Sequence, residues 1–425
     1  MNGDLLPENN SQEPYYCEIC KKKHFRGDIY KQHFKFARKF AFETSIQNIH
    51  DSIQRNFKFE SEEIKIPKGI LEIKDFSRLE IINRIDAIYH LIYEQISNNQ
   101  LPSINVPLRR RENIIYNEDK QLFLGLQTKT IEFGDEYFEF LKILRIADIV
   151  KELLINNFHA TKREVFYNDV ALFKEQKYSD RAIEDLTTLL TTFRDNLHIV
   201  AAPKGTCVGR LKIRHRNEII DLTTLGSGGW TISPLLDNID IIESDAEFIL
   251  VLEKDAAMMR LAEYRFWRKI PCILLTAQGT PNVAARTFLK ILVSELKLPA
   301  IGLADSDPYG LSILMTYAYG SVQSAHETAK LGINNFYWLG VLPEDIEKYQ
   351  IPREVQLKMV KSDLQRAHYM LKEPPIVQHK KLKEQLELMV ATKIKAEIQA
   401  FAARGFDFLT KYIIHKLGTG DLIKF

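Results

Sequence analysis

One tyrosine in this chain has neighbours that could make it a nucleophile. Tyr167 stands four residues after Arg163 in T-K-R-E-V-F-Y, a spacing that places both side chains on one face of a helix. A free tyrosine has a pKa of about 10, so attack needs a cation that binds phosphate and favours the ionised phenol. The adjacent Phe166 has no hydroxyl, so only Tyr167 of this pair could react. On these residues alone, a half-buried packing role for the tyrosine is slightly favoured.

Three carboxylates follow two apolar runs that are typical of buried strands. Glu253 ends F-I-L-V-L-E, and Asp305 and Asp307 follow A-I-G-L-A. In an open parallel sheet, ligand chemistry collects outside the carboxyl ends of the strands, so these groups should converge. Crowded carboxylates repel one another unless a cation is present, and hard oxygen ligands suit Mg²⁺. We therefore favour a Mg²⁺ site over the alternative that these residues only cap the helices that follow.

Two other segments could bind ligands. T-A-Q-G-T-P-N-V-A-A-R leads from a strand into a helix, where free backbone N–H groups can accept a phosphate. Near the N-terminus, Cys17, Cys20 and His33 fit the first three ligands of a zinc finger. The expected last histidine is missing, so a Zn²⁺ site and a vestigial one are both open.

Composition limits the class of protein. The chain has 425 residues, 45% of them hydrophobic and 27% charged, which indicates a soluble globular protein of two or three domains. Its net charge of +2 gives no argument for nucleic-acid binding. Four cysteines form no disulfide framework and favour a reducing compartment. We find no targeting segment and no apolar run near the length of about 20 residues that spans a membrane.

The residues around the tyrosine have a recognisable order. We predict helices over 137–156, over 161–173 and from an N-cap at Ser179 to about 196. A β-hairpin is predicted over 197–213. Helices followed by a hairpin are typical of a winged helix-turn-helix, which places a helix against the DNA groove.

From Phe248 the pattern changes to strand and helix in alternation, which predicts a doubly wound parallel sheet. The last part of the chain is mostly helical. The predicted class is therefore mixed α/β. We expect an N-terminal extension (1–60), a winged-helix (CAP-like) domain with the tyrosine (75–215), and a parallel-sheet domain with a helical C-terminal region (240–425).

The chain resembles the meiotic double-strand-break proteins related to the A subunit of DNA topoisomerase VI. The resemblance covers about 79–413, most of the chain. It is carried by K-R-E-V-F-Y, P-K-G-T-C-V-G-R-L, G-S-G-G-W-T-I-S-P, L-E-K-D-A, T-A-Q-G-T-P-N-V-A-A-R, L-A-D-S-D-P-Y-G, W-L-G-V-L-P-E-D, K-A-E-I-Q-A and G-F-D-F-L. So many ordered matches are more specific than any one of them, and they favour chemistry over packing for Tyr167.

The resemblance implies a winged-helix domain that carries the nucleophile and a Toprim domain that binds Mg²⁺. Tyr167 would attack a backbone phosphate and become linked to the 5′ end of the broken strand, with Arg163 as the family's upstream arginine. Glu253, Asp305 and Asp307 match the Toprim acids, and Asp307 would be either a direct ligand or a charge-stabilising neighbour. In the family the tyrosine of one protomer meets the metal of the other, so that a dimer cuts both strands.

The chain also departs from the family. It has Gln278 where the family often has lysine, and Asn282 where it has aspartate, which leaves a lysine contact to DNA at this loop in doubt. We expect Arg286 and Lys204 to contact DNA. The zinc-like segment lies outside the shared region.

Together with these residues, the resemblance implies a Mg²⁺-dependent DNA transesterase, located in the nucleus, that makes double-strand breaks to start meiotic recombination. The expected partners are double-stranded DNA, accessory meiotic proteins, and either a second copy of the chain or an A2B2-type assembly with a topoisomerase VI B-like subunit, without a membrane. No Gly-rich ATP-binding signature is evident, so ATP-driven gating would need that other subunit. The alternatives are the A subunit of an ATP-dependent type IIB topoisomerase, a Toprim nuclease that hydrolyses DNA, and a catalytically silent DNA-binding scaffold.

Overall fold

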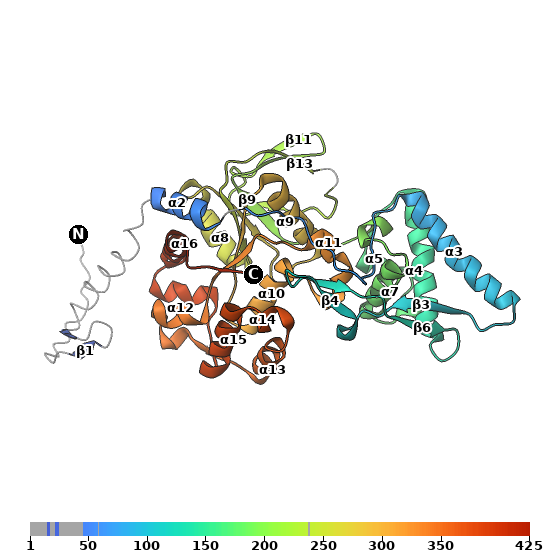
Figure 1. Ribbon diagram of the computed structural model, residues 1–425. Helices are drawn as coiled ribbons and strands as arrows, with labels where there is room; N and C mark the ends of the chain where they lie inside the picture. The colour runs from blue at the N-terminus through green and yellow to red at the C-terminus, as the bar shows by residue number, and fades with distance from the viewer. Residues whose placement is uncertain (1–14, 18–21, 25–45, 58, 237–238) are drawn as a thin grey trace.

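The computed structural model describes residues 15–17, 22–24, 46–57, 59–236 and 239–425. Of the predicted zinc ligands, Cys20 and His33 lie outside the described residues, as does the side chain of Cys17, so zinc binding is not tested. The remaining chain forms two bodies that lie side by side, one around a large sheet and one around helices α3, α4 and α7 (Figure 1). In the described part of the chain, no helix combines the length and apolarity needed to cross a bilayer.

The larger body is built on a seven-stranded sheet. Its order is β12 (Trp230–Thr231), β9 (Thr206–Gly209), β15 (Cys272–Thr276), β14 (Phe248–Leu252), β16 (Ala300–Leu303), β17 (Phe336–Gly340) and β20 (Ile423–Lys424). The four strands from β15 to β17 are parallel and wholly buried, and antiparallel strands flank them. The mixed α/β class with a mostly parallel central sheet is therefore confirmed.

Helices cover both faces of this sheet, because alternate residues of its strands point to opposite sides. Ile249 and Val251 of β14 join the core formed with α9 (Val283–Leu296) and α10 (Pro308–Ala318). Leu250 and Leu252 join the other core, formed with α8 (Asp255–Glu263) and α16 (Phe408–Thr419). In register, Leu252 lies opposite Thr276 and Leu303, so the three strands end at one edge.

The smaller body is a helical cluster with its own core. It contains α3 (Arg78–Ser97), α4 (Tyr137–Asn156), α5 (Lys162–Asn168), α6 (Val170–Phe173) and α7 (Gln176–Leu189). The antiparallel pair of β3 (Ser103–Pro107) and β6 (Thr128–Glu132) packs on these helices, and β7 (Ala160–Thr161) pairs with β8 (Ile199–Val200) in parallel.

The other elements complete the two bodies. They are α2 (Ile46–Asn56), η1 (Arg111–Asn113), β4 (Ile114–Tyr116), β5 (Leu122–Leu124), η2 (Arg194–Leu197), β10 (Lys212–His215), β11 (Glu218–Asp221), β13 (Ile239–Glu243), η3 (Phe266–Arg268), η4 (Val322–Glu327), α11 (Thr328–Leu331), α12 (Pro343–Lys348), η5 (Arg353–Val355), β18 (Leu357–Lys358), α13 (Lys361–Met370), α14 (Pro374–Val377), α15 (Lys380–Thr392), β19 (Ile394–Lys395) and η6 (Ile398–Arg404). The predicted helical C-terminal region is present, and β20 returns the chain to the sheet.

The hairpin predicted over 197–213 is wrong. β8 pairs with β7, whereas β9 enters the large sheet beside β15. Cys207 and Val208 of β9 are both buried and belong to opposite cores, so this strand needs a sheet that is covered on both faces. The winged form of the smaller body is therefore not confirmed, and the predicted division into 1–60, 75–215 and 240–425 stays a prediction.

The predicted start of α7 at Ser179 is also wrong. The helix begins three residues earlier, at Gln176, after Lys174 turns the chain with a positive φ of 61°. Ser179 is buried inside the helix, where its hydroxyl donates to the carbonyl of Gln176 at 2.9 Å.

Candidate active site

A short, firmly capped helix carries the tyrosine. The hydroxyl of Thr161 accepts a hydrogen bond from the N–H of Glu164 (3.2 Å), and the Glu164 carboxylate accepts one from the N–H of Thr161 (2.6 Å). This capping box starts α5. The helix has only seven residues because the backbone leaves helical geometry at Asp169, which caps α6 through the N–H of Leu172. The single helix predicted over 161–173 is thus two helices, and the break falls two residues after Tyr167.

Tyr167 points away from the core of its own body. Its side chain is 60% exposed, whereas Val165 of the same helix is buried in the core. The guanidinium of Arg163 lies 5.7 Å from the centre of the Tyr167 ring. Within the described residues, Arg163 forms no ion pair, so its charge is free to meet a phosphate. This exposure argues against the packing role that the residues alone slightly favoured.

The three predicted acids lie together at the carboxyl edge of the large sheet. A carboxylate oxygen of Glu253, Oε2, accepts a hydrogen bond from the N–H of Asp305 at 2.8 Å. Asp305 Oδ2 lies 2.7 Å from the ammonium of Lys254, and its Oδ1 accepts from the N–H of Ile398 at 2.9 Å. Asp307 caps α10 through the N–H of Gly310 at 2.8 Å. The capping alternative therefore applies to Asp307, whereas Glu253 bonds to the loop that carries Asp305, and Asp305 bonds to Lys254 and Ile398.

Distant segments hold this acidic loop in place. The N–H of Gly279, in the T-A-Q-G-T-P turn, donates to the carbonyl of Glu253 at 2.8 Å. Ala396, in K-A-E-I-Q-A, forms an isolated β-bridge with Ser306. A Cβ on Gly310 would lie 2.5 Å from the carbonyl oxygen of Asp305 and 3.1 Å from Glu253 Oε2, so only glycine fits there. The loop is thus fixed by packing and by backbone contacts.

The acids repel one another in this arrangement. Burial, followed by the charges of Asp305 and Asp307, raises the pKa of Glu253 to about 7. Burial also raises the pKa of Asp305, against the opposing effect of Lys254. Close like charges of this kind are relieved when a cation binds.

The donor atoms at this edge fit a hard divalent cation. In the described residues, no three acidic, histidine or cysteine side chains are already arranged around a metal position. Glu253 Oε1 and Asp307 Oδ2 nevertheless make no hydrogen bond in that part of the chain, and both are carboxylate oxygens, the ligands that Mg²⁺ prefers. A cation that also used Asp305 would share that residue with Lys254.

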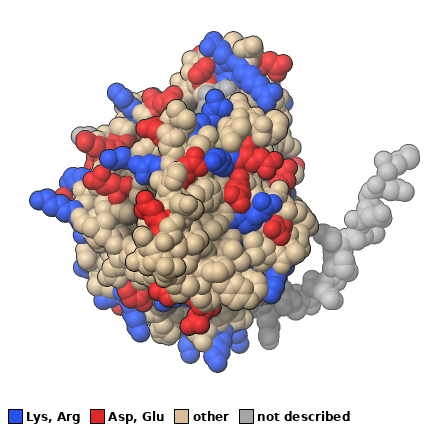
Figure 2. All heavy atoms as spheres, turned by 90° about the vertical axis from the view of Figure 1, so that its right-hand side faces the viewer, with Lys and Arg blue, Asp and Glu red and all other residues tan. Residues whose placement is uncertain are grey.

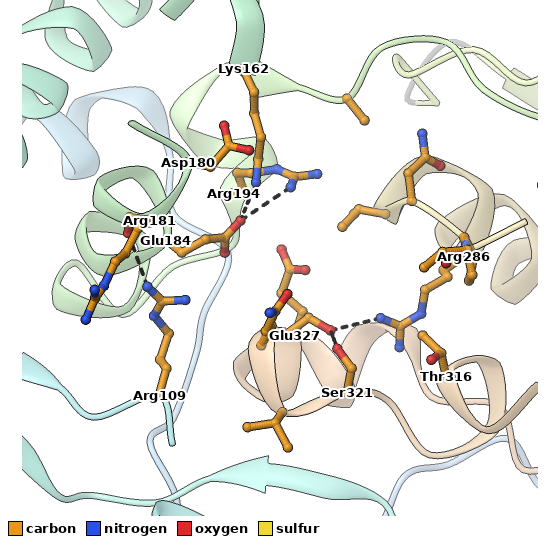
Figure 3. Close-up of a pocket in the computed structure, with 18 of the residues that line it drawn as sticks. Arg109, Lys162, Asp180, Arg181, Glu184, Arg194, Arg286, Thr316, Ser321 and Glu327 are labelled. Carbon is orange, nitrogen blue, oxygen red and sulfur yellow. Dashed lines mark hydrogen bonds and ion pairs between the residues drawn. The ribbon is translucent and has the colours of Figure 1, made fainter. Parts of the chain in front are cut away.

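A basic cavity of about 1340 Å³ separates the two bodies (Figure 3). Eleven lysines and arginines line it against four acids: Arg109, Arg110, Lys129, Lys162, Arg163, Lys177, Arg181, Arg194, Lys204, Arg286 and Arg366, with Asp180, Glu184, Asp185 and Glu327. On the outer face of the smaller body, by contrast, positive and negative side chains are interspersed (Figure 2). The lining of the cavity therefore carries an excess of positive charge although the whole chain is nearly neutral.

Both predicted DNA contacts line this cavity. The ammonium of Lys204 donates to the carbonyl of Thr280 at 2.9 Å. Arg286 is only 2% exposed, and its Nη1 donates to Ser324 at 3.1 Å while Nε and Nη2 have no partner in the described part of the chain. Burial lowers the pKa of Arg286 to about 10. Contacts of these residues with DNA stay predictions, and DNA would reach Arg286 only through the cavity.

The tyrosine and the acids do not meet within one chain. α5 lies in the smaller body, whereas α8 and α10, which follow Glu253 and Asp307, lie in the larger one (Figure 1). Arg163 lines the cavity, but Tyr167, Glu253, Asp305 and Asp307 are not among its lining residues.

Two charged residues of the site were missed by the sequence reasoning. Lys254 pairs with Asp305, and Glu184 pairs with Lys162, the residue before Arg163. Two signals in the sequence could have indicated these pairs. One is a lysine directly after the predicted metal ligand Glu253, and the other is a lysine in the first turn of a helix, where a positive charge is unfavourable.

Comparison with known proteins agrees with this geometry. Residues 248–417 match the Toprim domain of the family that unites topoisomerase 6 A subunits with Spo11, and residues 138–199 match the family described as "Type IIB DNA topoisomerase". The chain is 44% identical to the DNA topoisomerase 6 A subunit of Arabidopsis thaliana over 278 residues, which is 65% of this chain and 65% of that protein. It is 39% identical to the DNA topoisomerase 6 A3 subunit of Oryza sativa subsp. indica (83% of this chain, 80% of that protein) and 30% identical to "Meiotic recombination protein SPO11" of Mus musculus (84% and 91%).

Proposed function

Because this chain belongs to the family of topoisomerase 6 A subunits and Spo11 proteins, whose members are DNA-cleaving transesterases, we propose that it breaks both strands of DNA through covalent phosphotyrosyl links and so initiates meiotic recombination. The single observation that carries the proposal is the exposed Tyr167 beside the guanidinium of Arg163, which forms no ion pair within the described residues. The meiotic relatives, 30% identical over nine tenths of the mouse protein, support the biological role.

The chemistry proposed for Tyr167 is a transfer and consumes no water. The phenolate oxygen forms a bond to phosphorus while the bond from phosphorus to the 3′ oxygen breaks. The 5′ end remains on the tyrosine, and the 3′ oxygen takes up a proton to leave as a hydroxyl. Arg163 stabilises the charge that develops on the phosphate oxygens.

We assign Glu253, Asp305 and Asp307 to a Mg²⁺ site, as Toprim domains generally bind this ion. When bound, the ion supplies positive charge beside the scissile phosphate. The backbone N–H of Asp305 orients the Glu253 carboxylate, and Lys254 and the N–H of Ile398 orient the carboxylate of Asp305.

We further propose that the active site is completed between two copies of the chain. Tyr167 and the acids lie in different bodies of one chain, so a second protomer would bring its acids to the exposed tyrosine (Figure 1). Two such sites in a symmetric dimer make one cut in each strand. Further proposed partners are double-stranded DNA, which Lys204 and Arg286 would contact, accessory meiotic proteins and a B-like subunit, all in the nucleus.

The second candidate is the A subunit of an ATP-dependent type IIB topoisomerase. It is favoured by the two plant relatives named as topoisomerase 6 A subunits, at 44% and 39% identity. Supercoil relaxation with a B-type subunit, with and without ATP, separates the two candidates. Efficient ATP-dependent relaxation would establish the topoisomerase role, and breaks without relaxation would establish the break-only role.

The proposal is tested on the DNA ends. The protein is incubated with labelled duplex DNA and Mg²⁺, denatured with detergent, and assayed for label that stays with the protein. We expect protein on the 5′ ends, free 3′ hydroxyls, and neither in Tyr167→Phe. Clean ends without protein would establish hydrolysis instead, and no cleavage by any assembly of the chain would favour the scaffold.

A further inference from the structure

A nearly buried carboxylate stands where the tyrosine helix meets the larger body. Glu184 of α7 has its Oε1 2.7 Å from the ammonium of Lys162, the first residue of α5, and 3.5 Å from Nη1 of Arg194. Its other oxygen lies 3.5 Å from Nε2 of His326 in η4. Figure 3 shows Lys162 and Arg194 converging on Glu184 from one side of the cavity. One side chain thus touches α5, η2 and η4.

The position of Lys162 makes this contact necessary. A cation in the first turn of a helix opposes the helix dipole, and Arg163 places a second positive charge beside it. Lys162 and Arg194 are mostly buried, so without Glu184 their charges would lack their carboxylate partner. Glu184 therefore holds Lys162, the first residue of α5, beside α7.

Glu184 is charged at neutral pH. Burial acts to raise its pKa, but the neighbouring positive charges, chiefly that of Lys162, outweigh burial and lower the pKa to about 2. His326 is fully enclosed, and burial lowers its pKa despite the carboxylates of Glu327 and Glu184. The link to η4 is therefore a packed contact between Glu184 and a mostly neutral imidazole.

The same contact leads toward the acidic loop. η4 follows α10 after a short connection, and α10 starts at its cap, Asp307. A shift of Glu184 would thus displace its contacts with α5 on one side and with η4, the element after α10, on the other.

We propose that Glu184 is a positioning residue for the nucleophile: through Lys162 it fixes the orientation of α5, and through His326 it ties that orientation to the body that carries the acids. The proposal rests on Tyr167 being the nucleophile. A misplacement of a reacting atom by about 1 Å can cost about 100-fold in rate. Loss of Glu184 should therefore lower the rate of covalent cleavage by about 30- to 100-fold, with DNA affinity unchanged.

The test uses the full chain, in the assembly that cleaves DNA, on two duplex substrates. One is normal DNA, and the other has sulfur in place of the 3′ bridging oxygen at the cut site. Sulfur leaves as a thiolate without the protonation or charge stabilisation that the oxygen needs, because a thiol has a pKa of about 8.5. A defect at the acids should therefore be relieved on the sulfur substrate, whereas a misplaced tyrosine should remain slow on both.

Glu184→Gln is compared with Glu62→Gln as a matched control. Glu62 is also buried and also holds a lysine, Lys290, at 2.7 Å, but it lies on the larger body away from α5. We expect Glu184→Gln to lose about 30- to 100-fold on both substrates. We expect Glu62→Gln, assayed below its melting temperature, to cleave like the wild type. A wild-type rate for Glu184→Gln, or its recovery on the sulfur substrate, would overturn the proposal.

Variants of Lys162 provide a second, independent test if Glu184→Gln does not fold. Lys162→Met should match the loss in Glu184→Gln, Lys162→Arg should restore part of the rate, and the double variant should lose no more than either single one. Additive losses would overturn the proposal, because Lys162 and Glu184 would then act separately. Cleavage by Tyr167→Phe would refute the proposed function itself, whereas an inactive Tyr167→Phe beside a fully active Glu184→Gln would refute this inference alone.

Discussion

Tyr167 projects from a seven-residue helix with 60% of its side chain exposed, whereas Asp305 is 5% exposed and bonded on both oxygens. The tyrosine hydroxyl has no hydrogen-bond partner in the described residues, while Glu253 and Asp305 are bonded to each other. The acids are held by hydrogen bonds and an ion pair within the larger body, whereas Tyr167 points outward from the smaller one. Under the proposed function, one chain would therefore contain both halves of the chemistry and would not assemble them by itself.

The largest effect is expected when the two regions are inactivated in separate copies. Tyr167→Phe and Glu253→Gln should each lose more than about 1000-fold in cleavage. Mixed in equal amounts, they should recover about a quarter of the wild-type single-strand cuts and no double-strand breaks. The reason is that about half of the dimers are mixed, and each of these has one complete site. Nicked and linear plasmid, separated on a gel, give the answer.

The control for this mixture is each variant alone at the doubled concentration. If the mixture makes no nicks although mixed dimers form, the tyrosine and the acids must act within one chain. The separation of Tyr167 from the acids would then belong to an open conformation, and the two bodies of one chain would close before cleavage.

A smaller effect is expected from Arg163, the cation on the tyrosine side. Arg163→Ala should lower the rate of covalent complex formation by about 100-fold, since it removes one charge that stabilises the transition state. Arg163→Lys keeps the charge but not the planar fork, and it should recover part of the rate. Single-turnover cleavage at saturating DNA measures both. An equal loss in both variants would show that the geometry of the guanidinium matters more than its charge.

The smallest effect concerns stability on the acidic side. The pKa of Glu253 is raised from 4.5 to about 7 in the folded chain, so the folded state holds this proton more tightly than the unfolded state. Its contribution to stability is therefore present below pH 4.5 and is lost as the pH rises through 7. Without metal at pH 8, Glu253→Gln should melt about 2 °C above the wild type, and the two should converge near pH 4.

Adding Mg²⁺ at pH 8 should reverse this order, because the ion binds the folded wild type and relieves the repulsion. Thermal melts across this pH range, with Mg²⁺ or with a chelator, supply the measurement. A wild type that is more stable than Glu253→Gln at pH 8 in the chelator would show that the acids do not repel one another as described.

Much of the larger body could be predicted from local pattern. F-I-L-V-L and A-I-G-L are continuous apolar runs because their strands are covered on both faces, and Glu253 and Asp305 follow directly where those strands end. The convergence of the acids followed from the parallel order alone.

The rest of the fold and of the site was less predictable because its contacts are not local. Thr206–Gly209 looks like one arm of a hairpin, but it pairs with β15, more than sixty residues later. Ser179 resembles an N-cap, but the positive φ of Lys174 sets the start of α7 earlier. The pair of Glu184 and Lys162 joins two helices through a contact that no spacing reveals. Burial of Arg286 likewise depends on the packing of η4.

The most direct test of the central claim is to find the residue that carries the DNA. Wild-type protein is allowed to cleave duplex DNA, the DNA is digested to short stubs, and the tryptic peptides are sequenced by mass spectrometry. We expect a 5′-linked nucleotide on Tyr167 and on no other residue, and no adduct in Tyr167→Phe. A nucleotide on a different side chain, or cleavage by Tyr167→Phe at the wild-type rate, would contradict it.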